Sequence, residues 1–467
     1  MKNREGWACH KRFPITAVEN AYLTGYNAKH MLDIHFIREN LELVKDAVVK
    51  KSADVDIDRL LLLDDERKVL RQELDAKKAE QNRRSNEIRI ASGVERERII
   101  EAMQHLKAGM AEAEERYQEL LKQWTKLLLS VPNIPSPDTP VGPDESGNIV
   151  VRKWGEPTKF DFKPKAHWDI GRELGIIDSE RAAEISGARF TYIKGDLALM
   201  QFALITLALK VLTSREELTA IAEKAGLDVA TTPFIPVIPP VFMRSDVMGR
   251  MARLQPIDER YFFEKDDLVL VGSAEHTLGP LHMNETLGEE QMPIRYAGYS
   301  TAFRREAGAA GKDTRGILRQ HQFDKIELES FTRPEDGYRE QEFFVAIQEH
   351  LMQLLKLPYQ VVAICTGDMG KPDHRQFDIE TWMPGQDAYR ETQTSDYMGG
   401  YQARRLNTRI KNKEGDLTHA HMNDATAFAI GRTLIAIIEN YQQADGTVKV
   451  PDALVSYVGK TVLGGAR

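Results

Sequence analysis

The stretch from Phe303 to Leu328 gathers side chains that could bind a nucleotide. It reads FRREAGAAGKDTRGILRQHQFDKIEL, with the adjacent arginines Arg304 and Arg305, a glutamate after them, and Phe323 between polar neighbours. A guanidinium group can hold a phosphate through two parallel hydrogen bonds, and an aromatic ring among polar residues offers a stacking face for a base. These residue types therefore indicate a nucleotide site.

A hairpin is needed to bring these side chains together. Phe303–Glu306 and His321–Leu328 alternate in side-chain type as strands do, whereas Ala307–Gly316 contains three glycines and is typical of a loop. On such an antiparallel hairpin, residues two apart share a face. The predicted sets are Arg304 with Glu306, and Phe323 with Lys325 and Glu327. Taken singly, the charged run also fits a solvated strand edge and the phenylalanine a core position; their combination favours the site.

Length and composition indicate a globular protein of two or three domains. The chain has 467 residues, of which 42% are hydrophobic and 29% charged, which fits neither a disordered nor a membrane protein. The longest apolar run, Leu197–Leu212, is interrupted by polar residues and is shorter than the roughly 20 residues needed to span a bilayer. We expect it to form a buried helix.

The cysteine content indicates the redox compartment of the protein, and the net charge limits how it can bind nucleic acid. The two cysteines, Cys9 and Cys365, provide neither a disulfide framework nor a zinc cluster, so a reducing cytoplasm is expected. With a net charge of -8, the chain as a whole would repel phosphate, and a nucleic-acid partner must meet a local basic patch.

Residues from about 58 to 124 have a helical pattern free of proline, with one turn signal at Ser92-Gly93. We predict an antiparallel coiled-coil hairpin whose arm of about 34 residues per helix is roughly 50 Å long. The second helix has apolar residues at alternating steps of four and three, a heptad seam. Its members are Ile99, Met103, Leu106, Met110, Ala113, Tyr117, Leu120, Trp124 and Leu127. The first helix has a similar seam at Leu63, Leu70, Leu74 and Ile88.

Positive charge is concentrated toward the tip of this arm. Between Ala76 and Ser92 basic residues outnumber acidic ones, so this is a candidate phosphate-binding patch, although a solvated helix face has the same composition. The basic residues are Lys77, Lys78, Arg83, Arg84 and Arg89.

Three further segments indicate where regular elements begin and end. Val131–Pro143 contains five prolines, too many for continued regular structure, and Thr213–Thr232 is expected to add a surface helix at 214–225. FIPVIPPVFMR fits a strand ended by prolines. His419 and His421 are expected to be loop residues.

FRREAGAAGKDTRGILRQHQF resembles motif 2 of the seryl-tRNA synthetases, which are class II aminoacyl-tRNA synthetases. FIPVIPPVFMR is similar to their motif 1 at the dimer interface, and NDATAFAIGRTLIAIIENYQ to their motif 3. The resemblance implies an α+β fold: an antiparallel sheet flanked by helices, preceded by a coiled-coil arm. The expected domains are an extension at 1–30, expected to be disordered, an arm at 31–130, a linker at 131–157 and a catalytic domain at 158–467.

The resemblance assigns the nucleotide site. It implies that Arg304 binds the α-phosphate of ATP, Arg432 binds the γ-phosphate, Phe323 stacks on adenine, Glu306 reads the adenine amino group, and Glu391 binds Mg²⁺. Arg304 and Arg432 are the expected catalytic residues. The other residues expected near ATP are Arg305, Gln320, His321, Gln322, Thr392, Gln393 and Thr394.

The resemblance also assigns an amino-acid site and a tRNA site. Serine is expected to contact Ser273, Ala274, Glu275, Arg304, Glu327 and Thr426. The tRNA is expected to contact the five basic residues of the arm. The chain departs from the family at Thr392–Asp396, where relatives often read Ser-Ser-Cys-Ser-Asn, and at Asp424, where they usually have asparagine or glycine.

The activity implied is that of a cytoplasmic, homodimeric enzyme. It activates L-serine with ATP and transfers the seryl group to the 3′-terminal adenosine of tRNA-Ser, with selenocysteine tRNA as a further candidate and no membrane partner. Two alternatives remain open. One is a paralogue that loads an amino acid onto a carrier protein, against which the long arm argues; the other is a tRNA-binding protein with an inactive site, against which the motif arginines argue.

Overall fold

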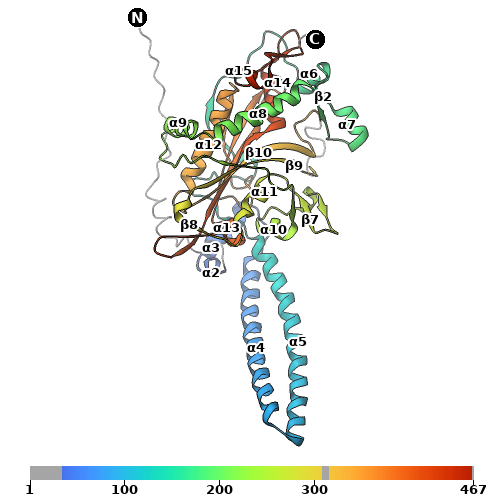
Figure 1. Ribbon diagram of the computed structural model, residues 1–467, viewed down its shortest axis with the longest axis vertical. Coiled ribbons are helices and arrows are strands. Elements are labelled where there is room, and N and C mark those ends of the chain that lie inside the picture. Colours follow the sequence, from blue (N-terminus) through green and yellow to red (C-terminus); the bar gives the residue numbers. More distant parts are fainter. Residues whose placement is uncertain (1–33, 308–314, 465–467) are drawn as a thin grey trace.

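The computed structural model describes residues 34–307 and 315–464. The extension at 1–30 and most of the predicted loop Ala307–Gly316 lie outside the described residues. The chain forms a body built on a large sheet, from which two long helices project as an arm (Figure 1). This confirms the predicted α+β architecture with a helical arm.

The arm consists of α4 (Ile57–Ile90) and α5 (Gly93–Ser130), antiparallel and packed along their length. The 34 residues of α4 correspond to about 50 Å. Asp56 caps α4 by accepting a hydrogen bond from the backbone N–H of Arg59, and Gly93 starts α5 with a φ of +58°. The predicted seam is confirmed by its buried members Leu63, Leu70, Leu74, Met103, Ala113 and Tyr117.

Two short helices, α2 (Ile34–Glu39) and α3 (Leu41–Lys50), pack with the base of the arm and fasten it to the body. The apolar cluster there includes Tyr401 of the body. The guanidinium of Arg405 lies 3.9 Å from the Tyr401 ring centre and donates hydrogen bonds to the carbonyl oxygens of Leu129 and Val131, where α5 ends. These contacts fix the direction in which the arm leaves the body.

The main sheet has eight strands in the order β1-β11-β12-β13-β16-β10-β9-β4, antiparallel except for the β4–β9 pair. In that order the strands are Ile149–Trp154, Tyr359–Ala363, Arg375–Met383, Ala388–Gly399, His421–Ala429, Gln322–Thr332, Ile294–Phe303 and Ile235–Val237. Strand β1 lies inside the segment expected to be a linker, so this segment contributes an edge strand to the main sheet.

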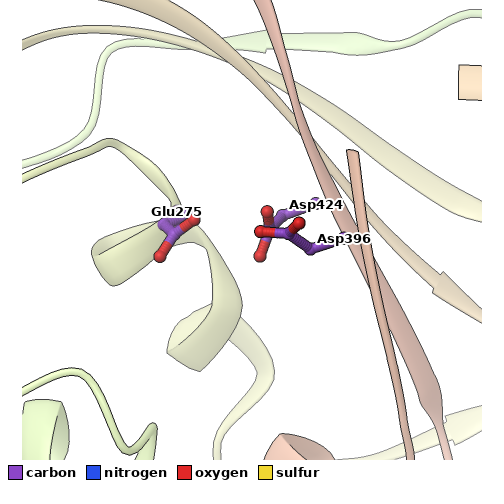
Figure 2. A group of neighbouring side chains, drawn as sticks. All are labelled: Glu275, Asp396 and Asp424. Atoms are coloured by element: carbon purple, nitrogen blue, oxygen red, sulfur yellow. The ribbon is translucent and has the colours of Figure 1, made fainter. Parts of the chain in front are cut away.

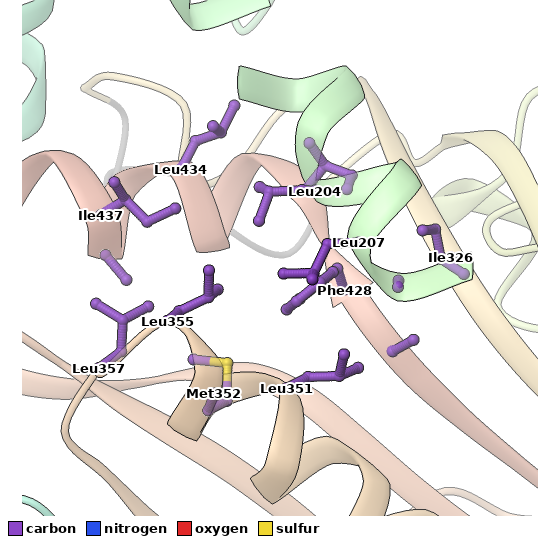
Figure 3. Close-up of a cluster of buried hydrophobic side chains, with 14 of the residues drawn as sticks. Leu204, Leu207, Ile326, Leu351, Met352, Leu355, Leu357, Phe428, Leu434 and Ile437 are labelled. Carbon is purple, nitrogen blue, oxygen red and sulfur yellow. The ribbon is translucent and has the colours of Figure 1, made fainter. Parts of the chain in front are cut away.

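Helices α8 (Asp196–Leu212), α12 (Gly337–Leu354) and α14 (Ile430–Asn440) cover one face of this sheet and enclose the main core (Figure 3). The predicted buried helix is thus confirmed as α8. Helix α9 (Arg215–Ala225) is the predicted added helix, and its apolar residues join the core. Among the described residues, no single helix is long and apolar enough to cross a membrane; α8 and α9 reach that length only as a pair bent by 76°.

The remaining elements are short. The helices are α6 (His167–Glu173), α7 (Ser179–Ser186), α10 (Ser245–Arg250), α11 (Glu275–Leu278), α13 (Tyr401–Leu406) and α15 (Asp452–Val458). The strands are β2 (Ile177–Asp178), β3 (Tyr192–Ile193), β5 (Phe242–Arg244), β6 (Phe262–Phe263), β7 (Leu268–Leu270), β8 (Thr286–Gly288), β14 (Arg409–Lys411), β15 (Leu417–His419), β17 (Val448–Lys449) and β18 (Val462–Leu463). His419 and His421 therefore lie in strands, and their prediction as loop residues is wrong.

The predicted hairpin is present as β9 and β10, with Phe323 opposite Ala302. Its first strand ends at Phe303, three residues earlier than predicted. Arg304 to Glu306 have left the strand, and Glu306 has a φ of +51°. The prediction of strand structure through Glu306 is therefore wrong: the backbone turns away here, and the arginine side chains are carried on a loop rather than on the pleat.

Candidate active site

The side chains available to a substrate project from the sheet face opposite the core helices, which we call the site face. On β10 the apolar residues Ile326 and Leu328 point into the core, so the residues between them point the other way. The site face carries Phe323, Lys325, Glu327 and Glu329 from β10, Asp424 and Thr426 from β16, and Thr394 and Asp396 from β13.

Arg304 and Phe323 face each other at the end of the hairpin where the loop joins β9 to β10. The guanidinium carbon of Arg304 lies 5.4 Å from the centre of the Phe323 ring, and Nε of Arg304 donates to the carbonyl oxygen of Gly272 at 3.1 Å. The backbone of Arg304 is held by His321, whose carbonyl accepts from its N–H and whose ring nitrogen Nδ1 lies 2.9 Å from its carbonyl oxygen. The fold thus places a cation and an aromatic ring together, as the sequence predicts.

Arg432, in the first turn of α14, reaches Glu391 near the start of β13. Its Nη1 lies 2.8 Å from Oε1 of Glu391 and 2.9 Å from the carbonyl oxygen of the same residue. The pKa of Glu391 is below its ordinary value, because removal from water would raise it but the charges of Arg432 and Arg304 outweigh that effect. Glu391 is therefore a carboxylate at neutral pH, within the field of both motif arginines.

A cluster of buried polar side chains around Glu327 lies beside this group, and we call this cluster the pocket of Glu327. Oε1 of Glu327 accepts hydrogen bonds from the hydroxyls of Ser273 at 2.9 Å and Thr426 at 3.4 Å, and Lys325 forms an ion pair with it. Burial raises the pKa of Glu327 despite that lysine. Ala274 is buried immediately before α11, so its backbone sets the approach of Glu275 to the same pocket.

Glu275 enters the pocket from α11 and is bound by a residue that sequence reasoning missed. Nε of Arg253 lies 2.9 Å from its Oε1, and Nε2 of His276 lies 3.3 Å from the same oxygen. Burial alone would raise the pKa of Glu275, but Arg253 holds it well below its usual range. Burial also lowers the pKa of His276 to about 4, so this imidazole is neutral at neutral pH.

Arg253 and Arg260 come from the segment before β6. Arg253 reaches the site at Glu275. Nε of Arg260 donates to the carbonyl oxygen of Arg253 at 3.0 Å. Burial, together with the charges of Arg304 and Arg253, lowers the pKa of Arg260 to about 10. Neither residue lies in a motif with recognisable spacing, so no sequence signal points to them.

Several predicted residues are placed apart from this group. The hydroxyl of Thr392 bonds with that of Thr381 at 2.8 Å, and the amide of Gln393 donates to the carbonyl oxygen of Ala427 at 2.6 Å. Both side chains are buried within the sheet rather than on the site face. The hydroxyl of Thr394 does lie on the site face, where it donates to Asp396 at 3.1 Å.

The residues around the glycine-rich loop form a rim. Arg319 lies 3.3 Å from the carboxylate of Glu306. Arg305 and Gln322 are exposed, and Gln320 is buried with an amide nitrogen that has no hydrogen-bond partner within the described part of the chain. These residues lie in the loop that joins β9 to β10 or, for Gln322, at the first position of β10, next to Arg304 and Phe323 in the chain.

The basic residues of the arm divide into two groups. Lys77 turns toward the other helix, with Nζ 2.7 Å from Glu73 and 3.2 Å from the carbonyl oxygen of Gly109, and Arg84 donates to Glu80 at 2.8 Å. Lys78, Arg83 and Arg89 are exposed, and the contacts of Arg83 with Glu80 and Glu87 are loose, at 3.8 and 4.0 Å. These three side chains are the ones that solvent, or a phosphate, can reach.

Comparison with known proteins connects both parts of the molecule to one family. A family model described as "tRNA synthetase class II core domain (G, H, P, S and T)" matches residues 261–441, and one described as "Seryl-tRNA synthetase N-terminal domain" matches residues 31–135. The chain is 40% identical over 440 residues to the serine--tRNA ligase of Thermodesulfovibrio yellowstonii, covering 93% of this chain and 100% of that protein.

Solved structures give the same result. The seryl-tRNA synthetase of Pyrococcus horikoshii, complexed with ATP, superposes with a TM-score of 0.79 at 36% identity, covering 93% of this chain and 99% of that one. The cytoplasmic serine-tRNA ligase of Naegleria fowleri in complex with AMP superposes with a TM-score of 0.74 at 30% identity, with the same coverage.

Proposed function

The chain belongs to the seryl-tRNA synthetase family, and from that premise we propose how its own residues divide the work of the enzyme. A serine--tRNA ligase activates L-serine with ATP to seryl-adenylate and then transfers the seryl group to the 3′-terminal adenosine of tRNA-Ser. The observation that carries the assignment to residues is the position of Arg304, Phe323, Glu391 and Arg432 beside the buried pocket of Glu327.

The adenylation step needs positioning and charge neutralisation rather than a covalent nucleophile. The serine carboxylate attacks the α-phosphate of ATP and pyrophosphate leaves, so negative charge accumulates on the phosphate oxygens. Arg304 is placed to stabilise that charge while Phe323 supports the adenine ring. Arg432 is placed to hold the far end of the triphosphate, since α14 begins at Ile430 and its N-terminus favours anions.

Glu391 and its surroundings fit Mg²⁺. Its carboxylate is ionised and half exposed, with 48% of the side chain accessible. Burial, followed by the charge of Glu391, raises the pKa of the neighbouring Asp378 well above its usual range. A donor set made only of oxygen atoms suits a hard cation. The metal, when bound, supplies further neutralisation of the phosphate charge. Glu391 and Asp378 would hold it.

The pocket of Glu327 is suited to an amino acid with a hydroxyl. A hydroxyl group that enters it can form hydrogen bonds with Glu327 and Thr426, which alanine has no hydroxyl to form. Glu275 lies close enough to Glu327 to raise its pKa and is itself ionised, so it suits the substrate's ammonium group. This supports serine selection without a separate editing site.

Replacing Thr426 with valine should weaken serine selectively. The change keeps the shape but removes the hydroxyl near Glu327, so kcat/KM for serine in ATP–pyrophosphate exchange should fall roughly tenfold. Alanine cannot use this hydroxyl, so its kcat/KM should change little and the serine-to-alanine ratio should fall by the same factor. Thr286→Val, on the exposed face of β8, is the matched control. An equal loss for both amino acids would show that Thr426 only supports the fold.

The arm is proposed to bind tRNA through its exposed cations. Lys78, Arg83 and Arg89 are accessible near the tip, whereas Lys77 and Arg84 are engaged within the arm. Phosphate and sugar contacts of this kind position an RNA without reading its sequence. The same enzyme could accept selenocysteine tRNA, because such contacts follow the shape of the RNA.

Removing two exposed cations together, in Lys78→Ala/Arg89→Ala, should weaken tRNA binding without affecting adenylation. Each lost phosphate contact lowers the salt dependence of binding, so the slope of log K against log salt should fall by about 2. The measurement is aminoacylation as a function of tRNA concentration at several salt concentrations. Lys122→Ala, exposed nearer the base of the arm, is the control. An unchanged slope would place the RNA elsewhere.

A homodimer is proposed from the exposed apolar residues around motif 1. Ile235, Ile238, Phe242, Phe262 and Phe263 are each at least 40% exposed, and they come from β4, β5 and β6 and the connection between the first two. Apolar surface gathered in this way marks an interface. We place the enzyme in the cytoplasm, consistent with Cys365 remaining a free thiol.

Two assays separate this function from its alternatives. Serine-dependent exchange between ATP and pyrophosphate, tested against other amino acids, reports adenylation; charging of purified tRNA-Ser reports transfer. Both activities are expected. Exchange without charging would favour a paralogue that loads a carrier protein, and absence of both would favour a tRNA-binding protein with an inactive site.

A further inference from the structure

The two acidic residues expected to recognise the substrates are held in different ways. Glu275, expected to contact the amino acid, lies opposite Asp396 and Asp424 (Figure 2), and Arg253 pairs with its carboxylate. Glu306, expected to read the adenine amino group, lies outside every strand and helix and has a φ of +51°, a conformation that is costly for any residue with a side chain. Contacts from elsewhere in the fold must therefore keep Glu306 in place.

Arg189 makes such a contact. It lies in the turn between α7 and β3, 117 residues before Glu306 in the chain, and its Nη1 donates a hydrogen bond to the carbonyl oxygen of Glu306 at 2.9 Å. Arg189 also has a positive φ, of +61°. Residues other than glycine rarely adopt this left-handed conformation, and it is found most often at functional sites. Here a hydrogen bond joins two such residues directly.

His321 ties Arg189 to the end of the hairpin. Its backbone N–H donates to the carbonyl oxygen of Arg189 at 3.1 Å, and its own carbonyl oxygen accepts from the backbone N–H of Arg304 at 3.0 Å. Its ring nitrogen Nδ1 donates to the carbonyl oxygen of Arg304 at 2.9 Å, and the ring packs against Phe190, the neighbour of Arg189, with 5.3 Å between centres. The turn that follows β9 is thus held at Arg304 by His321 and at Glu306 by Arg189.

The side chain of Glu306 has a contact of its own. Nη1 of Arg319 lies 3.3 Å from Oε2 of Glu306, and only 14% of the Glu306 side chain is exposed. An ion pair of this kind uses the same carboxylate that an adenine amino group needs. Arg189 instead binds the backbone, so it can fix the residue without competing with the base for the carboxylate.

We propose that Arg189 is a positioning residue for base selection: it keeps Glu306 in the turn from which its carboxylate accepts a hydrogen bond from the 6-amino group of adenine. This inference rests on the proposed function and on the adenine-reading role expected of Glu306. Without Arg189, the carbonyl oxygen of Glu306 loses this donor, and the backbone can relax to a negative φ. Arg304 has a separate hydrogen bond to Gly272, so the phosphate end of the site should keep its geometry.

The test compares ATP with purine riboside triphosphate, which lacks the 6-amino group, in serine-dependent pyrophosphate exchange. The wild type should prefer ATP by at least about tenfold in kcat/KM, because a hydrogen bond to a charged group is lost with the analogue. Arg189→Ala should lower kcat/KM for ATP by about the same factor and change that for the analogue little. The ratio of the two values does not depend on the fraction of folded enzyme, so a partial loss of folding cannot imitate this result.

Three further variants sharpen the comparison. Arg189→Lys keeps one donor and should restore part of the preference for ATP. Arg181→Ala, exposed on α7 and paired there with Asp178, is the matched control and should leave the ratio unchanged. Glu306→Ala should abolish the preference, and adding Arg189→Ala to it should lower the ratio no further, because both changes remove the same interaction.

Several results would overturn the proposal. One is an unchanged ratio in Arg189→Ala, and another is an equal loss for both nucleotides, which would limit Arg189 to supporting the fold. A wild type that does not distinguish the two nucleotides would show that Glu306 does not read the amino group. If the wild type shows no serine-dependent exchange at all, the proposed function fails instead; the same comparison, made on the Kd values of the two nucleotides by calorimetry, then still decides the role of Arg189.

Discussion

Replacing Arg304 with alanine should reduce serine-dependent ATP–pyrophosphate exchange to the limit of detection. The guanidinium stands over Phe323 at the end of β9, where the α-phosphate and the serine carboxylate are expected to meet. Removing a group that stabilises charge in the transition state costs about 10²–10³ in rate. The loss should appear mainly in kcat, because the charge develops during the reaction rather than on binding.

Stability should be almost unaffected, since within the described residues the side chain of Arg304 donates one hydrogen bond, to Gly272, and contacts one aromatic ring. Arg304→Lys keeps the charge but cannot form two parallel hydrogen bonds, so it should recover only part of the activity. Arg172→Ala, on the exposed side of α6, controls for the loss of a positive charge. Exchange within a few-fold of the wild type in Arg304→Ala would refute the role given to this residue.

Deleting the outer arm, Glu66–Leu120, and closing the gap with a short glycine-containing turn should abolish tRNA charging while adenylation continues. The two cut ends lie at a similar level of the arm, since Arg67 of α4 stacks on Trp124 of α5 with 4.5 Å between the guanidinium carbon and the ring centre. The base cluster around Ile57, Leu60 and Val131 stays intact, so the body should fold as before. Charging is measured with purified tRNA-Ser and adenylation by pyrophosphate exchange.

The control for this truncation is the full-length chain, with circular dichroism used to confirm that only arm helix is lost. If the truncated protein charges tRNA at the wild-type rate, the arm is dispensable and the body alone recognises the acceptor. If exchange is lost as well, the arm supports the catalytic sheet. The hydrogen bonds from Arg405 to the carbonyl oxygens of Leu129 and Val131 would then be the contacts to test for that support.

The candidate site was predictable where its residues lie in one local pattern. The motif from Phe303 to Leu328 places Arg304 and Phe323 together because a hairpin needs only neighbouring residues to form, and the structure does bring them together. The predicted strand end was wrong by three residues. The backbone turns at Glu306, but the alternation of side-chain types along the sequence does not reveal such a turn. The resemblance to the family grouped Thr392 and Gln393 with the nucleotide site, but their side chains are buried in the sheet.

By itself, the sequence determined the arm and the core helices. Repeats of 3.5 and 3.6 residues bury one side of a helix wherever that helix sits, so the seam through Leu70 and Tyr117 and the apolar run of α8 could be read directly. Tertiary structure alone decided which charges meet. Arg253, Glu275, Asp396 and Asp424 come from four separate elements, and their interaction depends on strand order and register, which residue spacing does not encode.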